Sequence, residues 1–498
     1  MDLDPDACYR ALSTRDARFD GRLFVGVKTT GIYCRPICPA RTPKRENVRF
    51  FPSAAAAREA GFRPCLRCRP ETSPESSAWR GTAATVSRAL RLIEAGALDQ
   101  GGAPELATRL GVGERQLRRL FQEHLGASPL AVAQTRRIHL AKQLIHETAL
   151  PMTEVAMAAG FGSVRRFNET FKALFGRPPA ALRRGRGVGV AADAITVSLA
   201  FRPPYNWDVL LAFLGARAIP GIEVVERGVY SRTIGLGDAR GILSVRHGPK
   251  DRLKVTVRFP RPTALPSIIA RVRRVFDLAA DPAAIAEDLS GDKGLALLIA
   301  ARPGLRVPGA WDGFELAVRA ILGQQITVTA ARGLAGRLTP AYGEPLTETD
   351  GARPGLTHLF PTPERLATAD AAALGMPGAR ARALVGLAEA VSADPAIFGL
   401  GRSLEDAVAG LRRLSGVGEW TAQYIAMREL REPDAFPAAD IGLMRALADE
   451  SGRRPSPAEL LARAEAWRPW RAYAALHLWA ADAEGAKPAR SDDERRVA

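Results

Sequence analysis

The sequence predicts a multidomain α+β protein of four units, over residues 1–72, 82–184, 194–305 and 306–485. Three observations lead to this class. All five cysteines lie within the first 68 residues, a helical block with an internal repeat follows them, and strand-like segments then precede a longer helical block. A chain of 498 residues is long enough for several hydrophobic cores of ordinary size.

Four of the cysteines form two close pairs, Cys34 with Cys38 and Cys65 with Cys68, with 26 residues between the pairs. Each pair can supply two thiolates from one turn, and zinc accepts four sulfur ligands in a tetrahedron. We therefore expect bound Zn²⁺ as the cofactor, with two disulfides or free thiols as the alternatives. Cys8 stands outside the pattern and is expected to be a plain thiol.

A helical motif occurs twice in residues 82–184, with an offset of 49 to 50 residues. Each copy has the pattern helix, glycine-bearing turn, helix, and the two turns are residues 111–113 and 160–162. This pattern is typical of the helix-turn-helix, whose second helix can enter the DNA major groove. A solvated charged face is the alternative interpretation. The expected second helices carry the candidate DNA-binding residues Arg115, Arg118, Arg119, Arg165 and Arg166.

The charge is uneven along the chain. Residues 1–190 carry 31 basic and 17 acidic residues, whereas the whole chain carries 70 and 53, for a net charge of +17. A basic block indicates a polyanion such as nucleic acid or an anionic membrane surface, and a codon bias toward Arg is the bland alternative. Mean hydropathy of −0.07 with 25% charged residues excludes the disordered, collagen-like and membrane-embedded classes.

No secretion signal or membrane span is expected, because the N-terminus is acidic and no run of 18 apolar residues occurs. We therefore expect a cytoplasmic protein. Residues 70–80, rich in Pro, Ser and Glu, and residues 183–193, rich in Gly and Arg, are expected to be linkers. Strands are expected at 195–199, 224–227, 242–245 and 253–257, and the pattern from about 311 to 485 is helical.

The sharpest motif of the second half lies at residues 411–422, where Leu-x-x-Leu-x-Gly-Val-Gly stands between two helical patterns. A tight Gly-x-Gly turn before a helix presents backbone N–H groups to a phosphate. We therefore expect Gly416, Val417 and Gly418 to bind DNA as a helix-hairpin-helix, with an ordinary helix–helix turn as the alternative. Asp440 follows Gly418 by 22 residues and directly precedes a new helical pattern. Without the hairpin before it, this position would indicate only the N-cap of that helix.

These motifs resemble three known families, which together cover nearly the whole chain. The cysteine segments 29–36 and 61–68 closely resemble the zinc domain of the bacterial Ada-type alkylation-response regulator, and residues 82–184 resemble AraC-type DNA-binding domains. Residues 194–485 resemble bacterial 3-methyladenine DNA glycosylase II, of the helix-hairpin-helix superfamily. The resemblance implies a natural fusion of a damage sensor with a glycosylase made of a TATA-binding-protein-like α/β subdomain and an all-α domain.

The glycosylase resemblance makes Asp440 the catalytic carboxylate, which stabilises the positive charge that develops on the sugar as the N-glycosidic bond breaks. Relatives that also cleave the strand use a lysine where this chain has Trp420. We therefore expect a monofunctional DNA-3-methyladenine glycosylase II that leaves an abasic site. Ala439 replaces an acid that precedes the aspartate in the family.

The same resemblance implies a pocket for a purine that has been flipped out of the duplex. An aromatic pocket favours an electron-poor alkylated base through stacking and cation–π attraction. The family fills the hole in the duplex with a leucine, and this chain has Gln325 at that position. The residues expected to bind the substrate are Trp420, Tyr424, Trp479, Gln324 and Gln325.

The Ada-type resemblance makes Cys34 the nucleophile that irreversibly accepts a methyl group from a DNA phosphotriester, so we expect a stoichiometric methylphosphotriester-DNA methyltransferase. Four thiolates on one zinc carry a net charge of about −2, and methylation of one reduces it to about −1, which should strengthen DNA binding and activate transcription. Thr30, Arg41 and Arg67 match positions expected near the DNA backbone. No cysteine follows Cys68, so the acceptor of a guanine-O-alkyl transferase is absent.

We expect the partners to be double-stranded DNA with alkylation damage, promoter DNA and RNA polymerase, without a membrane, and we expect a monomer associated with the bacterial nucleoid. Two alternatives stay open. One is a transcriptional regulator whose glycosylase-like part only binds DNA. Gln325 favours it, because this residue replaces the leucine that fills the hole in the duplex in the family. The other is a structural zinc site without methyl transfer.

Overall fold

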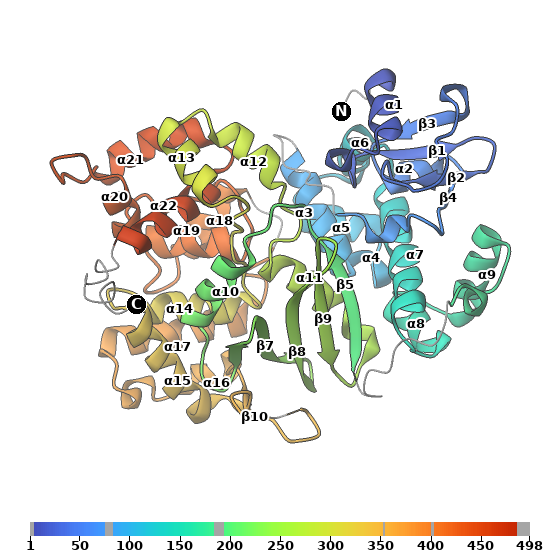
Figure 1. The fold of residues 1–498 in the computed structure, drawn as a ribbon. Helices are drawn as coiled ribbons and strands as arrows, with labels where there is room; N and C mark the ends of the chain where they lie inside the picture. The colour runs from blue at the N-terminus through green and yellow to red at the C-terminus, as the bar shows by residue number, and fades with distance from the viewer. Residues whose placement is uncertain (1–3, 75–82, 184–193, 352–353, 400–402, 486–498) are drawn as a thin grey trace, which may run out of the picture.

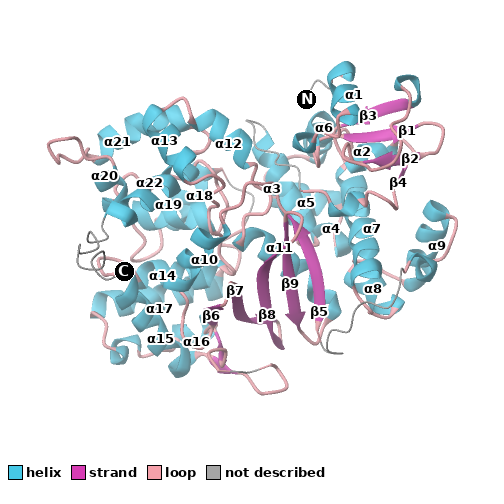
Figure 2. Cartoon of the chain, viewed as in Figure 1, coloured by secondary structure: helices cyan, strands magenta, loops and turns pink. Residues whose placement is uncertain are grey.

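The computed structural model describes residues 4–74, 83–183, 194–351, 354–399 and 403–485. In chain order it contains a small domain around the cysteines, an all-helical domain, an antiparallel sheet with its helices, and a larger helical domain (Figure 1). Most of the strands gather in two separate sheets with helices around them (Figure 2). The predicted multidomain α+β class is therefore confirmed.

The cysteine domain is built on a four-stranded sheet with the order β3-β1-β2-β4. β4 lies parallel to β2, and the N–H of Cys65 just after β4 donates to the carbonyl of Tyr33 in β2 at 3.0 Å. This pairing places Cys34, at the end of β2, beside the segment that carries the second cysteine pair. The elements of the domain are α1 (Pro5–Ser13), β1 (Phe24–Val27), β2 (Ile32–Cys34), β3 (Val48–Phe51), α2 (Ala54–Glu59) and β4 (Arg63–Pro64).

The internal repeat forms two helix-turn-helix units, α5–α6 and α8–α9, which are joined by the long helix α7. The turn glycines Gly111 (φ +68°) and Gly160 (φ +84°) take a left-handed backbone that residues with a side chain rarely adopt. α6 and α9 both end at a left-handed glycine, Gly126 and Gly176. The helices are α3 (Ala83–Glu94), α4 (Ala97–Gln100), α5 (Ala103–Arg109), α6 (Glu114–Leu125), α7 (Pro129–Glu147), α8 (Met152–Ala158) and α9 (Val164–Phe175).

A five-stranded antiparallel sheet with the order β5-β9-β8-β7-β6 follows. The four predicted strands are present, whereas β7 was missed because three consecutive polar residues, Ser231, Arg232 and Thr233, stand in its middle. One continuous core joins this sheet, its helices and the second helix-turn-helix unit. The elements are β5 (Ile195–Ala200), α10 (Trp207–Ala216), β6 (Glu223–Glu226), β7 (Val229–Leu236), β8 (Ala239–Gly248), β9 (Arg252–Arg258) and α11 (Leu265–Val275).

The larger helical domain has its own core, which also includes residues of α12 and α13. These helices lie within the predicted 194–305 unit, as do Ile219 and Ile222 of the same core, whereas Trp311 belongs to the core of the sheet. The two cores therefore interleave along the chain, and the boundary at 305 stays a prediction. The helices are α12 (Pro282–Leu289), α13 (Lys293–Ala301), α14 (Gly313–Leu322), α15 (Val328–Tyr342), α16 (Pro363–Ala367), α17 (Gly378–Ala393), α18 (Leu404–Leu411), α19 (Glu419–Arg428), α20 (Ile441–Ala446), α21 (Pro457–Ala464) and α22 (Arg471–Gly485), with a small ribbon of β10 (Glu344–Pro345) and β11 (His358–Leu359).

Helix α7 connects the first domain to the sheet. The Lys142 ammonium, with a fully buried side chain, donates to the Cys65 carbonyl at 2.8 Å and to the Glu71 carboxylate at 2.7 Å. On the same helix, Gln143 donates to the Ser198 carbonyl of β5 at 2.8 Å, and the Ser198 N–H donates to Glu147 at 2.8 Å. One helix therefore holds both the cysteine loop and an edge of the sheet.

The predicted linkers fall mostly on residues outside the described part of the chain, namely 75–82 and 184–193. Residues 70–74 are a correction to the prediction, because Glu71 is buried against α7 rather than lying in an exposed linker. None of the helices in the described ranges combines the length and the apolar character that a membrane crossing requires.

Replacing Lys142 with Met should strongly destabilise the junction, because the buried Glu71 carboxylate loses its buried cation and keeps only the partly exposed Arg69. We expect a loss of about 3–5 kcal/mol in the free energy of unfolding, measured by guanidinium denaturation. The double variant Lys142→Met/Glu71→Gln should recover part of this loss. Glu169→Gln removes an exposed ion pair with Arg165 on α9 and should leave the transition unchanged. Equal losses in Lys142→Met and Glu169→Gln would contradict the role of α7.

Candidate active site and metal centre

A cavity of about 1800 Å³ opens between the larger helical domain and helices α10 and α11, which accompany the five-stranded sheet. Its lining residues come from strands β6 and β7, from loops, and from helices α10, α11, α14, α15, α19, α20 and α22. The fold thus brings together residues that lie far apart in the sequence. Every predicted catalytic or substrate-binding residue of the second half lines this cavity, namely Gln324, Gln325, Trp420, Tyr424, Asp440 and Trp479.

Asp440 stands at the N-terminus of α20, where its carboxylate accepts a hydrogen bond from the Leu443 N–H at 3.0 Å. The Trp479 indole donates to the same oxygen at 2.8 Å, and the Trp420 indole donates to the other oxygen at 2.7 Å. An ionised carboxylate only accepts hydrogen bonds, so three N–H donors match it. The carboxylate is therefore both an N-cap and a fixed anion at the wall of the cavity.

Trp420 and Tyr424 form one aromatic wall, with ring centroids 5.1 Å apart and planes 11° from parallel. Both project from α19, where a spacing of four residues puts side chains on one face. The Tyr424 hydroxyl accepts from Arg428 at 2.5 Å, and Arg428 also donates to the Pro308 and Gly309 carbonyls. Burial alone would raise the pKa of Tyr424, but the nearby Arg428 and Arg217 guanidinium groups outweigh it and lower this pKa.

The predicted hairpin consists of α18, a turn over residues 412–418, and α19. Gly416 has φ +75°, and a Cβ on it would lie 2.4 Å from the Ala383 Cβ, so both the conformation and the space require glycine. The Val417 N–H donates to the Leu414 carbonyl at 3.1 Å, and its side chain is buried. The exposed backbone at the tip of this turn therefore belongs to Gly416 and Gly418.

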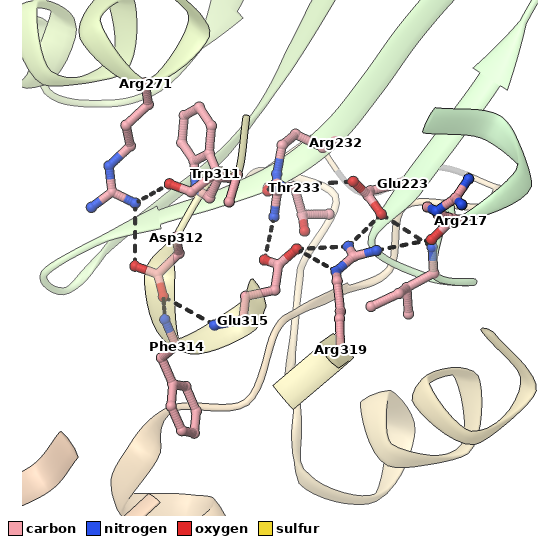
Figure 3. Close-up of polar contacts among 12 residues, drawn as sticks. Arg217, Glu223, Arg232, Thr233, Arg271, Trp311, Asp312, Phe314, Glu315 and Arg319 are labelled. Carbon is pink, nitrogen blue, oxygen red and sulfur yellow. Dashed lines mark hydrogen bonds and ion pairs between the residues drawn. The ribbon is translucent and has the colours of Figure 1, made fainter. Parts of the chain in front are cut away.

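A buried network of charges under the cavity was not predicted (Figure 3). Arg319 pairs with Glu223 at 2.5 Å and with Glu315 at 2.6 Å, while Arg232 pairs with Glu315 at 2.7 Å. Arg271 donates to the Trp311 carbonyl, and Asp312 caps the start of α14. The sequence signal was the pair of charges four residues apart, Glu315 and Arg319, inside an otherwise apolar helix.

Replacing Glu315 with Gln should make unfolding less dependent on pH. Burial raises the pKa of Glu315, but Arg232 and Arg319 outweigh it and lower the pKa to about 2. A carboxyl group with a lowered pKa stabilises the fold above its unfolded value of about 4.3, and this contribution is lost as pH falls toward 2. We expect a loss of about 3–5 kcal/mol at pH 7 that shrinks at pH 3, measured by urea unfolding.

The control for this prediction is Asp238→Asn, which removes an exposed ion pair with Arg261. It should leave the unfolding midpoint unchanged at both pH values, because exposed pairs contribute little. A Glu315→Gln variant that loses the same stability at pH 7 and pH 3 would show that the carboxylate charge is not the cause.

In the first domain, the sulfur atoms of Cys34, Cys38, Cys65 and Cys68 lie within 4.8 Å of one another. Zinc–sulfur bonds of about 2.3 Å in a tetrahedron place sulfur atoms roughly 3.8 Å apart, so this donor set fits zinc. Backbone N–H groups support two of the sulfurs, from Arg35 to Cys68 at 3.4 Å and from Arg67 to Cys65 at 3.3 Å. Cys34 is the least buried of the four cysteines.

In the first two domains, the residues predicted to contact the DNA backbone and grooves lie on the surface. Thr30, Arg41 and Arg67 are exposed in the first domain. The helix-turn-helix arginines are exposed on the second helix of each unit, and Arg165 pairs with Glu169 on α9 at 2.8 Å. These residues are Arg115, Arg118 and Arg119 on α6, and Arg165 and Arg166 on α9.

Family models match four consecutive parts of the chain. They are the metal binding domain of Ada (residues 7–71), a helix-turn-helix domain (106–185), the AlkA N-terminal domain (196–312) and the HhH-GPD superfamily of base excision DNA repair proteins (318–472). The architecture therefore defines the class, a DNA glycosylase domain joined to a zinc domain and a helix-turn-helix domain.

Relatives with the same organisation exist. A protein of Mycobacterium tuberculosis, named probable bifunctional transcriptional activator/DNA repair enzyme AlkA, is 43% identical over 484 residues, which is 96% of this chain and 97% of that protein. The chain therefore belongs to the family of AlkA-type bifunctional transcriptional activators and DNA repair enzymes. Its four clustered cysteines form the zinc site of the Ada-type domain.

The second half has separate relatives. DNA-3-methyladenine glycosylase 2 of Escherichia coli is 36% identical over 286 residues, which is 57% of this chain and 96% of that protein. The solved structure of 3-methyladenine DNA-glycosylase from Archaeoglobus fulgidus has a TM-score of 0.51 at 22% identity, and the match covers 57% of this chain and 98% of that one. This last likeness shows the fold.

Proposed function

We propose that the chain excises alkylated purines from DNA as a monofunctional glycosylase, and that its zinc domain accepts methyl groups from DNA phosphotriesters and activates transcription through the helix-turn-helix units. The observation that carries the glycosylase proposal is the fixed carboxylate of Asp440. It lies beside the stacked rings of Trp420 and Tyr424 in a cavity large enough for a flipped base.

Excision breaks the bond between C1′ of the sugar and the ring nitrogen of the purine. The bonding electron pair leaves with the base, which alkylation has already made cationic, and water adds its oxygen to C1′ and releases a proton. The sugar passes through an oxocarbenium-like state, whose positive charge a fixed anion stabilises. Asp440 supplies this anion, and the indole donors of Trp420 and Trp479 hold it in place.

The proposed product is an abasic site rather than a cleaved strand. Strand cleavage requires an amine that forms a Schiff base with C1′. The corresponding position carries Trp420, whose indole donates a hydrogen bond to the Asp440 carboxylate. Borohydride should therefore trap no covalent complex between this protein and its DNA product.

For the zinc domain, we propose that the Cys34 thiolate attacks the methyl carbon of a phosphotriester, so that a sulfur–carbon bond forms, a carbon–oxygen bond breaks and a phosphodiester anion leaves. Bound zinc would keep the four sulfurs deprotonated and nucleophilic. The greater exposure of Cys34 supports its assignment, because the other three cysteines are buried.

The exposed arginines of α6 and α9 support major-groove binding to promoter DNA. We propose further that RNA polymerase is recruited there, that the protein is a monomer, and that it acts in the cytoplasm on nucleoid DNA. The alternative is a regulator whose glycosylase-like part only binds DNA. It is favoured by Gln325, a polar side chain where the family has leucine.

Replacing Asp440 with Asn should lower the single-turnover rate of purine release from methylated duplex DNA by at least about 100-fold, because the anion is lost while the shape is kept. Binding of the same duplex should change little. Asp292→Asn is a matched control, because Asp292 also caps a helix (α13) and also accepts from a tryptophan indole, that of Trp467, but lies outside the cavity. It should leave the rate unchanged.

Full release by Asp440→Asn, or no release by the wild type, would contradict the catalytic proposal. The second result, combined with tight binding of damaged duplex, would support the DNA-binding alternative instead.

Incubation with methylphosphotriester DNA should increase the mass of the Cys34 peptide by one methylene group and leave every other cysteine unmodified. The Cys34→Ser variant should accept no methyl group, and its zinc content reports whether the site still forms. Cys8→Ser is the control and should react like the wild type, because Cys8 is buried in a separate cluster. An unmodified Cys34 peptide would favour the structural zinc site.

A further inference from the structure

We propose that Gln324 and Arg380 are positioning residues that hold the loop 323–327 at a fixed place beside the hairpin turn 412–418. Through this connection, binding of a DNA phosphate at the turn would deliver Gln325 to the duplex as the base is extruded. The proposal rests on the glycosylase function proposed above and assigns residues that open the duplex rather than break the glycosidic bond.

The loop 323–327 is short and carries an unusual backbone. It joins the C-terminus of α14 to Thr327, the N-cap of α15. Gln325 lies at its tip with φ +58°, is exposed and lines the mouth of the cavity. A left-handed backbone at a residue other than glycine costs about 1 kcal/mol or more, so the surrounding contacts must hold it.

Gln324 supplies these contacts with its side chain. The Gln324 carboxamide donates to the Gly416 carbonyl of the hairpin turn at 2.8 Å and to the Thr421 hydroxyl of α19 at 3.1 Å. A carboxamide NH₂ group has two donor hydrogens, and this geometry uses both. The NH₂ group is thus committed to the protein, while the substrate contact expected of Gln324 stays a prediction.

Arg380 supplies the remaining contact. Its guanidinium group, from α17, donates to the backbone carbonyl of Gln324 at 2.5 Å. The side chain and the backbone of Gln324 are therefore held from three elements, the hairpin turn, α19 and α17. The residue next to Thr421 is Trp420, whose indole holds the Asp440 carboxylate.

The connection spans the three parts of the site that must act together. The turn presents exposed backbone to a phosphate, and the loop presents Gln325. Helix α19 carries Trp420, whose indole holds the Asp440 carboxylate. Fixing the loop to the turn sets the distance between the gripped phosphate and the inserted side chain. A base in single-stranded DNA needs no extrusion from a stack, so the connection should matter only for duplex DNA.

The test compares Gln324→Met, which keeps the length of the side chain and removes both donors, with the wild type. Single-turnover purine release is measured on a methylated oligonucleotide as duplex and as single strand. We expect the duplex rate to fall at least about tenfold, since small misplacements near a reacting centre carry losses of this size or more. The single-strand rate should stay within about threefold of wild type. Fluorescence of 2-aminopurine beside the lesion should show reduced base opening.

Arg380→Ala should give the same pattern, and Arg380→Lys, which keeps a donor, should recover part of the duplex rate. Arg382→Ala is the matched control, because Arg382 is an exposed arginine on the same helix without a contact to the loop among the described residues. Its duplex and single-strand rates should keep the wild-type ratio.

Equal losses on duplex and single-stranded DNA in Gln324→Met would overturn the proposal, because they would place Gln324 in the chemistry or in the stability of the fold. An unchanged duplex rate would also overturn it. Failure of the proposed function looks different, since the wild type would then release no purine from either substrate. In that case the 2-aminopurine signal still tests the connection.

Discussion

The whole second half of the molecule depends on how one carboxylate is held. Asp440 accepts hydrogen bonds from the Leu443 N–H and from the indoles of Trp420 and Trp479, which come from three different helices, α20, α19 and α22. An anion fixed in advance stabilises a developing cation without reorganising at the moment of reaction. Three helices of the larger domain therefore meet at this carboxylate, which forms part of the cavity wall.

Charge is also buried in two other places, each time as an ion pair. The Glu315, Arg232 and Arg319 group supports the floor of the cavity, and the Lys142–Glu71 pair holds the cysteine loop to α7. Such pairs add little net stability compared with apolar packing, but breaking one is costly, so they fix which surfaces meet. Helix α7 also joins the metal-binding domain to the sheet, because it contacts both the cysteine loop and β5.

Much of this was predictable from the sequence. Cysteine spacing predicted the zinc cluster, the glycine turns predicted the two helix-turn-helix units, and the pattern after residue 411 predicted the hairpin and the cap at Asp440. Contacts between distant segments were not predictable. From the sequence, Glu71 belongs to an expected linker, but Lys142 of α7 pairs with it in the fold. The polar Arg232 hides strand β7, and its partner Glu315 lies 83 residues further along the chain. The bond from Gln324 to the Gly416 carbonyl spans 92 residues and has no local signal in the sequence.

The central claim, that Asp440 acts by electrostatic stabilisation of a cationic sugar, is tested most directly by binding to two abasic-site mimics in duplex DNA. One mimic carries a cationic pyrrolidine ring in place of the sugar, and the other a neutral tetrahydrofuran ring. The wild type should bind the cationic mimic at least about tenfold more tightly, equivalent to about 1.4 kcal/mol, and Asp440→Asn should bind both alike. Equal affinities in the wild type, or an unchanged preference in Asp440→Asn, would contradict the claim.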